Sequence, residues 1–235
     1  VQDASHNYWP RQLRVSQSAL FEAVVAGLGS LHEEPRRFLE RIASRSFRLR
    51  DHADRVYPVE ADGLRDPAIR RTLADLGPAT VLYTGGGIVP AKLLELSGTR
   101  LLHVHPGFLP QVRGADGFLW SMLVRGRPGA SAFFLAEKID TGPVVLADEF
   151  EPLIFSAPSG VRPDDETLYR AVFAWIDPML RAEALLRTIR VTNALADARP
   201  REQEPSKGST YRFMDAATRR AALNVIFPQD SLKHA

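Results

Sequence analysis

The sequence predicts an α/β fold in which helices flank a mostly parallel sheet. Apolar runs over residues 79–84 and 100–105 are typical of buried strands, and the run over 91–97 between them is typical of a short helix. Strand, helix and strand in this order predict a parallel βαβ unit. A glycine-rich stretch follows the first strand and a Pro-Gly turn follows the second, so both strands end in loops at one sheet edge. We therefore expect a Rossmann-like arrangement.

The segment before this unit predicts mainly helices. Residues 1–15 are expected to form an irregular arm, followed by helices over 18–29 and over 33–51. Asp66 and Pro67 predict the N-cap and first turn of another helix. A short edge strand is expected over 55–59, because it contains a proline.

The segment after the unit continues the alternation. A helix is expected over 114–126, entered through Asp116, and then two strands over 130–137 and 143–151 joined by a hairpin-like turn. Residues 164–190 predict a long amphipathic helix, capped at Asp164 or Asp165 and strained at Pro178. The expected later elements are a polar linker-like segment over 192–209 and a small strand and a helix before residue 227. We expect a catalytic domain over 1–190 and a linker with a short C-terminal extension over 191–235.

Composition excludes several functional classes. The 235 residues contain no cysteine, which rules out disulfides, thiolate catalysis and cysteine-ligated zinc. The formal net charge is only +2, and the basic residues are spread along the chain, which argues against a nucleic-acid partner. No apolar run approaches the roughly 18 residues that would suggest a membrane span, and the first residues lack the apolar region of a secretion signal. We expect a cytoplasmic protein without a membrane partner.

Two histidines close the strand over 100–105. His103 and His105 share a face, because side chains alternate along a strand. Such a pair is either a hydrogen-bonded structural pair or part of a zinc site that needs a carboxylate such as Asp140 as a further ligand. Asp140 itself lies in the sequence IDTGP, which is either an ordinary turn or the place of a carboxylate that orients a histidine.

Three segments in order resemble the formyltransferases that use 10-formyltetrahydrofolate. They are TVLYTGGGIVPAKLLEL, HPGFLPQVRGADG followed by a tryptophan, and IDTGPVV, and the resemblance covers about residues 79 to 190. It implies that His105 is the catalytic histidine, that Asp140 tunes it and that His103 stands at the family's asparagine position. It also implies no metal. The two walls of the implied folate pocket are Gly87, Ile88 and Val89 on one side and Glu137, Lys138 and Ile139 on the other.

Three departures from the family pattern bear on function. His103 replaces the asparagine, Gly107 replaces a serine and is expected to loosen its turn, and the opening strand and glycine turn of the fold are absent from residues 1–50, so the first βα unit is divergent or missing. Arg113 and Asp116 are candidates to bind the charge of the substrate that accepts the formyl group, and a solvent-facing helix cap is the alternative role of Asp116.

The resemblance implies an enzyme that transfers the formyl group to a primary amine of a small metabolite, an amino sugar or an amino-acid-like compound. The roughly 45 residues after the long helix are too few for an oligonucleotide-binding barrel, which argues against a tRNA acceptor. Three alternatives remain: a formyltetrahydrofolate hydrolase, a metal-dependent amidohydrolase using His103, His105 and Asp140, and a non-catalytic folate-binding homologue. The question of a homodimer stays open.

Overall fold

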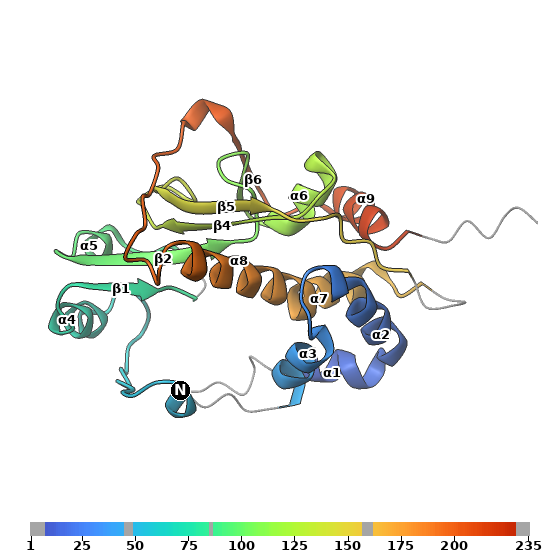
Figure 1. Cartoon of the computed structure of the whole chain (residues 1–235), viewed down its shortest axis with the longest axis horizontal. Helices are drawn as coiled ribbons and strands as arrows, with labels where there is room; N and C mark the ends of the chain where they lie inside the picture. Colours follow the sequence, from blue (N-terminus) through green and yellow to red (C-terminus); the bar gives the residue numbers. More distant parts are fainter. Residues whose placement is uncertain (1–7, 45–48, 85–86, 157–161, 229–235) are drawn as a thin grey trace, which may run out of the picture.

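A four-stranded sheet forms the centre of the computed structural model, which describes residues 8–44, 49–84, 87–156 and 162–228 (Figure 1). The strands lie in the order β1-β2-β4-β5. Their bounds are Ala79–Leu82 for β1, Thr99–His105 for β2, Gly129–Phe134 for β4 and Val144–Glu149 for β5. The predicted α/β class is confirmed.

The sheet is mixed. β1 and β2 are parallel and are joined through α5 (Ala91–Leu94), so the predicted βαβ unit is confirmed. β2 with β4 and β4 with β5 are antiparallel, and the last pair is the predicted hairpin. No strand precedes β1 in the described part of the chain, and β1 therefore forms an edge of the sheet. The expectation that the first βα unit is divergent or missing agrees with this edge.

The N-terminal region is helical from residue 8 onward. Its helices are α1 (Tyr8–Ser16), α2 (Ser18–Gly27) and α3 (Pro35–Ser44), with a 3-10 turn over Leu28–Ser30. The irregular arm expected over 1–15 is wrong for residues 8–15, because α1 buries Leu13 in the core, and residues 1–7 lie outside the described chain. The helices predicted over 18–29 and 33–51 correspond to α2 and α3, although 45–48 are not described.

Other elements before the sheet are short. A 3-10 turn spans Leu49–Asp51, and the edge strand expected over 55–59 does not form. Helix α4 spans Pro67–Asp75, and the side chain of Asp66 accepts a hydrogen bond from the backbone N–H of Ala68, as the capping pattern predicted.

The long predicted helix forms as one unbroken helical stretch that contains a π-helical turn. α7 (Asp165–Ala171) begins at the Asp164 cap, a π-helical turn spans Val172–Ile176, and α8 (Asp177–Val191) follows. Pro178 is the second residue of α8. Proline lacks the N–H that the regular ladder needs, so the shift to π geometry just before it is the form that the predicted strain takes.

The remaining elements bring the end of the chain back over the sheet. Strand β3 (Val112–Gly114) precedes α6 (Gly117–Arg125) and pairs in parallel with β6 (Ser209–Tyr211). A 3-10 turn spans Pro205–Lys207, and α9 (Ala216–Ile226) packs against α6 and α7. The predicted last strand and helix are confirmed, while the domain division at residue 190 stays a prediction.

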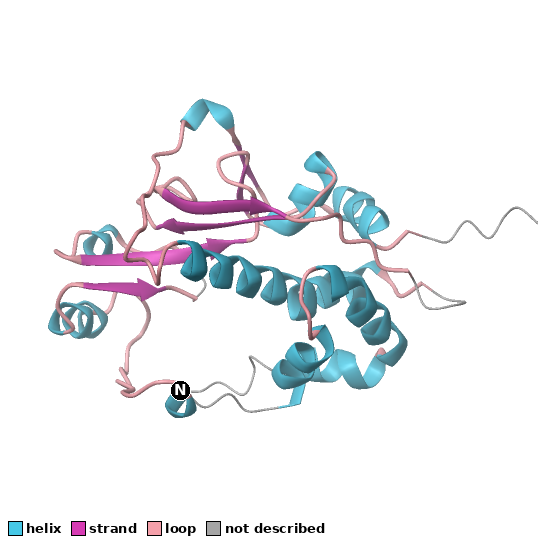
Figure 2. Ribbon diagram, in the orientation of Figure 1, coloured by secondary structure: helices cyan, strands magenta, loops and turns pink. Residues whose placement is uncertain are grey.

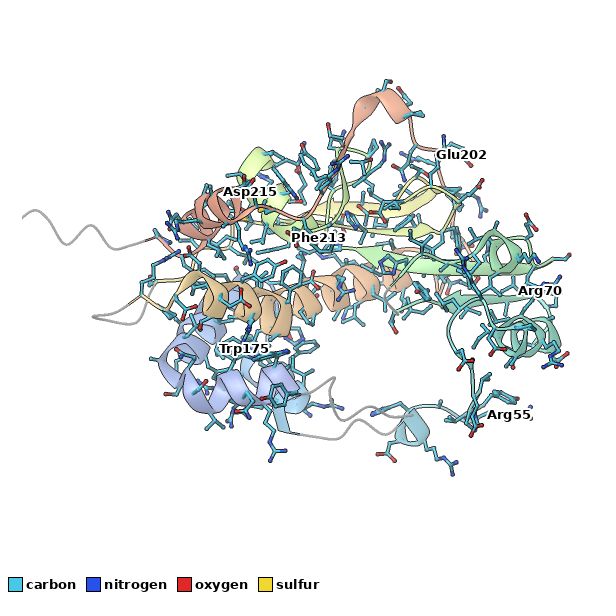
Figure 3. The ribbon with its side chains drawn as sticks, turned by 180° about the vertical axis from the view of Figure 1, so that it is seen from behind. Arg55, Arg70, Trp175, Glu202, Phe213 and Asp215 are labelled. Atoms are coloured by element: carbon cyan, nitrogen blue, oxygen red, sulfur yellow. The ribbon has the colours of Figure 1, made fainter. Side chains whose placement is uncertain are left out.

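The core joins the helices to the sheet. α8 contacts β2, β4 and β5, and Figure 2 shows it running along the sheet with α1–α3 beyond it. The largest buried side chain is Trp175 in the π-helical turn, labelled in Figure 3. A second, smaller cluster contains Val89, Leu93, Leu96 and Leu101. None of the helices in the described ranges has the length and apolar character that crossing a membrane requires.

Candidate active site

The strand β2 carries both histidines to its carboxyl end. His105 is the last residue of β2 and is only 3% exposed, whereas His103 is half-buried. Cross-strand pairing with β4 places Phe133 opposite His103 and Ser131 opposite His105. Both imidazoles therefore have their backbone positions set by a hydrogen-bonded strand in the middle of the sheet.

His105 lies beside Asp140, as the resemblance implied. Its Nδ1 is 3.4 Å from Oδ2 of Asp140, and the same oxygen accepts a hydrogen bond of 2.7 Å from the backbone N–H of Gly114. Asp140 has a φ of +53°, a left-handed conformation that is uncommon outside glycine but more accessible to aspartate. The turn after β4 thus holds the carboxylate against the end of β2.

The second nitrogen of His105 defines its tautomer. Nε2 lies 2.9 Å from the carbonyl oxygen of Val112, and because a carbonyl oxygen can only accept, Nε2 carries the hydrogen. Burial lowers the pKa of His105 below its ordinary value, although the charge of Asp140 and the Val112 bond oppose this effect. The neutral ring then has its lone pair on Nδ1, next to Asp140. A proton taken up there would be held between the carboxylate and the ring.

His103 is oriented by a different carbonyl. Its Nδ1 is 2.8 Å from the backbone oxygen of Tyr83 at the end of β1, so Nδ1 is the donor and a neutral ring has its lone pair on Nε2. The aromatic rings of Phe133 and Tyr83 lie beside the imidazole, with ring centroids at 5.9 and 6.0 Å. Each histidine is therefore held by the main chain.

A metal site was the rival interpretation of the pair. Among the described residues, no three histidine, aspartate or glutamate side chains are grouped so that they could hold a metal ion. In addition, the hydrogen on Nε2 of His105 occupies the position through which that nitrogen would ligate.

Two glycines allow the close packing around His105. A Cβ added at Gly107 would lie 2.5 Å from Nε2 of His105 and 2.6 Å from the oxygen of Val112, and one added at Gly117 would lie 3.0 Å from Cε1 of His105. Gly107 was expected to loosen its turn. Instead, the absence of a side chain at Gly107 lets Val112 approach the imidazole, which is the close backbone approach that favours glycine.

The two loops implied as folate-pocket walls follow β1 and β4. Gly87 is exposed with a φ of +98°, and Ile88 and Ile139 are 72% and 51% exposed. Glu137 and Lys138 are also exposed. Val89, by contrast, is buried in the smaller cluster, where Leu135 at the base of the other loop also packs. The loops thus share an anchored base and carry exposed apolar side chains, whereas Gly85 and Gly86 lie outside the described residues.

The two candidate acceptor residues are held within the fold. Arg113 is buried, and its guanidinium donates to the side chain of Gln203 and to the carbonyl oxygens of Glu204 and Pro205. Asp116 is 6% exposed, and its carboxylate accepts hydrogen bonds from the Tyr169 hydroxyl and the Met214 N–H instead of capping α6. In this conformation Arg113 is engaged with the chain, while Asp116 also lines a groove.

Gln203 is a supporting residue that sequence reasoning missed. Its amide nitrogen donates to the carbonyl oxygens of Asp140 and Gly142 at 2.9 and 2.7 Å, and its amide oxygen accepts from Arg113. A glutamine inside a polar, linker-like segment has no local pattern that distinguishes it from a solvated side chain. Only the return of the chain between α8 and β6 brings it to the Asp140 turn.

Comparison with known proteins identifies the family. Residues 15–156, more than half of the chain, match the family model described as formyl transferase. The methionyl-tRNA formyltransferase of Syntrophus aciditrophicus is 28% identical over 159 residues, which cover 66% of this chain and 46% of the relative. The human mitochondrial 10-formyltetrahydrofolate dehydrogenase is 26% identical over 125 residues, covering 52% of this chain and 12% of the relative. The chain spans less than half the length of these relatives.

The solved structures that this chain resembles include a sugar N-formyltransferase from Shewanella sp FDAARGOS_354. The two have 14% sequence identity and a TM-score of 0.46, and the match covers 69% of this chain and 65% of that one. The family model matches the sheet, both histidines and the Asp140 turn within one continuous stretch. By that match, this chain is a member of the formyl transferase family.

Proposed function

We propose that this protein transfers a formyl group from 10-formyltetrahydrofolate to a primary amine of a small metabolite. The observation that carries the proposal is the buried His105 ring, held with Nε2–H on the Val112 carbonyl and with Nδ1 facing Asp140. Family membership supports the formyl-transfer class. An amino sugar or an amino-acid-like amine is the acceptor class expected from the sequence.

The loops after β1 and β4 fit a flat, largely apolar donor such as a pteridine. Ile88 and Ile139 present large exposed apolar surfaces to such a ligand. Among the described residues outside its chain neighbours, no atom lies within 4 Å of a Cβ added at Gly87, so the backbone there is open. Tetrahydrofolate is bound in a solved HypX structure from Aquifex aeolicus, a protein that this chain resembles weakly. Gly87, Ile88, Ile139 and the backbone beside Glu137 and Lys138 would hold the donor, and Val89 would anchor its loop.

The donor supplies an electrophilic formyl carbon attached to N10. In the overall transfer, the amine nitrogen bonds to that carbon, the bond from carbon to N10 breaks, and the proton that the amine loses ends on N10. The chain offers two lone pairs for this proton, Nε2 of His103 and Nδ1 of His105 beside Asp140. Once protonated, an imidazole becomes a donor that can stabilise the negative charge developing on the formyl oxygen and can then pass the proton to N10.

The test is a titration of the protein with a stable 10-formyltetrahydrofolate analogue by calorimetry, with metal analysis of the same sample. Saturable binding by metal-free protein, followed by formamide production from the true donor and an amine panel, is the expected result. Stoichiometric zinc without folate binding would overturn the proposal in favour of the amidohydrolase alternative. Release of free formate at the same rate with and without amine would identify a hydrolase.

A further inference from the structure

A groove opens between α1, α7 and the segment before α9, apart from the loops after β1 and β4 that are proposed to hold the donor. It encloses about 570 Å³, within the range of about 300–1,000 Å³ for small-molecule sites. Four aromatic rings contribute to its lining, and Phe213, Trp9 and Phe173 keep 77%, 43% and 38% of their surfaces exposed. Tyr169 is the fourth, and Figure 3 labels Phe213 on the strand-to-helix connection.

One end of the groove lies next to the candidate catalytic histidine. Asp116 lines the groove, and the following residue, Gly117, packs so closely on His105 that an added Cβ would lie 3.0 Å from the ring. Consecutive Cα atoms are about 3.8 Å apart. A ligand that fills the groove therefore reaches Asp116, the residue just before the glycine that packs on His105.

The charges along the groove disfavour an anion. Among the described residues that line it, the charged side chains are Asp116, Glu166 and Arg170. Arg170 is already paired with Glu166 at 2.9 Å and lies 3.9 Å over the ring of Trp9. A phosphate or nucleotide would need free cationic donors, which this lining does not offer. Glu166 also pairs with Arg219 at 3.4 Å, and the carboxylate of Asp116 accepts from Tyr169 and Met214. The exposed rings of Phe173 and Phe213 therefore suit an apolar or aromatic body, and the amine itself is required by the proposed formyl transfer.

We propose that this groove binds the acceptor and that the acceptor is a primary amine with an aromatic or apolar body and no phosphate. The inference rests on the proposed formyl transfer and narrows its acceptor class. The body of the amine lies among Trp9, Phe173 and Phe213, and the amine end points along Asp116 toward the histidines.

Binding of 2-phenylethylamine and of glucosamine 6-phosphate to the full chain, measured by saturation-transfer NMR, tests the groove without requiring turnover. We expect saturable binding of the aromatic amine and weaker binding of the sugar phosphate. Phe213→Ala and Phe173→Ala should each weaken binding of 2-phenylethylamine at least about tenfold. Tyr57→Ala is the matched control, because Tyr57 is 55% exposed and outside the groove, and it should bind like the wild type.

Phe213 is the decisive position, because its exposed ring makes the variant the safer one for folding. Tighter binding of glucosamine 6-phosphate, no saturable binding of the aromatic amine, or unchanged binding in Phe213→Ala would each overturn the groove assignment. The donor-analogue titration is independent of these outcomes. Its failure would remove the proposed formyl transfer, whereas a successful titration with a failed groove test would remove only the acceptor class.

Discussion

The Nδ1 atom of His103 lies 2.8 Å from the backbone carbonyl oxygen of Tyr83, and this contact selects the ring nitrogen that is free to receive a proton. An asparagine at this position, as in the family pattern, would present an amide N–H donor instead. His103 in its neutral form is an acceptor at Nε2. Its chemistry in this chain therefore differs from that of the residue that it replaces.

The tautomer of His103 can be read directly. Long-range nitrogen–proton NMR correlations at a pH where the ring is neutral should show hydrogen on Nδ1 and a lone pair on Nε2. His103→Asn should lower kcat/KM by roughly 10²-fold, because an amide cannot hold the transferred proton. An Nε2–H tautomer, or a variant at least as fast as the wild type, would contradict the acceptor assignment.

Removing the charge of Asp140 should impair the reaction more than folding. Asp140→Asn leaves a side chain of similar size but no charge to hold a proton on Nδ1 of His105, 3.4 Å away. We expect the single-turnover rate constant to fall by about 10² to 10⁴-fold. Asp75→Asn, which changes an exposed aspartate at the end of α4, is the control and should leave the rate unchanged. Equal rates for Asp140→Asn and the wild type would exclude the carboxylate from the mechanism.

Buried His105 should make the fold sensitive to acid. Burial lowers the pKa of His105 in the folded chain, so the unfolded chain binds the proton at a higher pH. The free energy of unfolding should therefore fall as the pH decreases from the ordinary imidazole range toward the lowered pKa. When the free energy of unfolding is measured in urea at several pH values across this range, its change with pH should be smaller for His105→Asn than for the wild type. This holds whatever the variant's stability at neutral pH. Parallel curves would show that His105 does not contribute to the slope.

Side chains are excluded at Gly107. An added Cβ would meet Nε2 of His105 at 2.5 Å and the backbone oxygen of Val112 at 2.6 Å, and backbone yields little. Gly107→Ala should cost roughly 1–3 kcal/mol of unfolding free energy. Gly29→Ala is matched, because no atom of the described residues beyond its chain neighbours lies within 4 Å of its added Cβ, and its effect should stay within about 0.5 kcal/mol. Equal effects in chemical denaturation would mean that the Gly107 contact relaxes without cost.

Gln203 should couple the end of the chain to the site. Gln203→Ala removes the donors to the carbonyl oxygens of Asp140 and Gly142, at a cost of about 1–3 kcal/mol. Because those bonds hold the Asp140 turn, kcat should fall as well. The neighbouring variant Glu202→Ala alters an exposed side chain, labelled in Figure 3, and should behave as the wild type in both measurements. A stability loss without any change in kcat would limit Gln203 to a structural contribution.

Local patterns determined much of this protein from sequence alone. Strand alternation put His103 and His105 on one face, the Asp66 and Asp164 caps started their helices, and Pro178 marked the place of the π-helical turn in the long helix. These features depend on residues within one or two turns of one another, so periodicity and capping chemistry suffice to predict them. The family resemblance added the pairing of His105 with Asp140.

Contacts between distant segments were decided only by tertiary structure. The carbonyl oxygens of Tyr83 and Val112 set the two tautomers, but any residue presents a carbonyl, so the sequence has no signal for them. Gln203 reaches Asp140 across 63 positions of the chain, and α1 becomes ordered through burial of Leu13 against other helices. Such contacts arise from the packing free energy of the whole chain, which no local window contains.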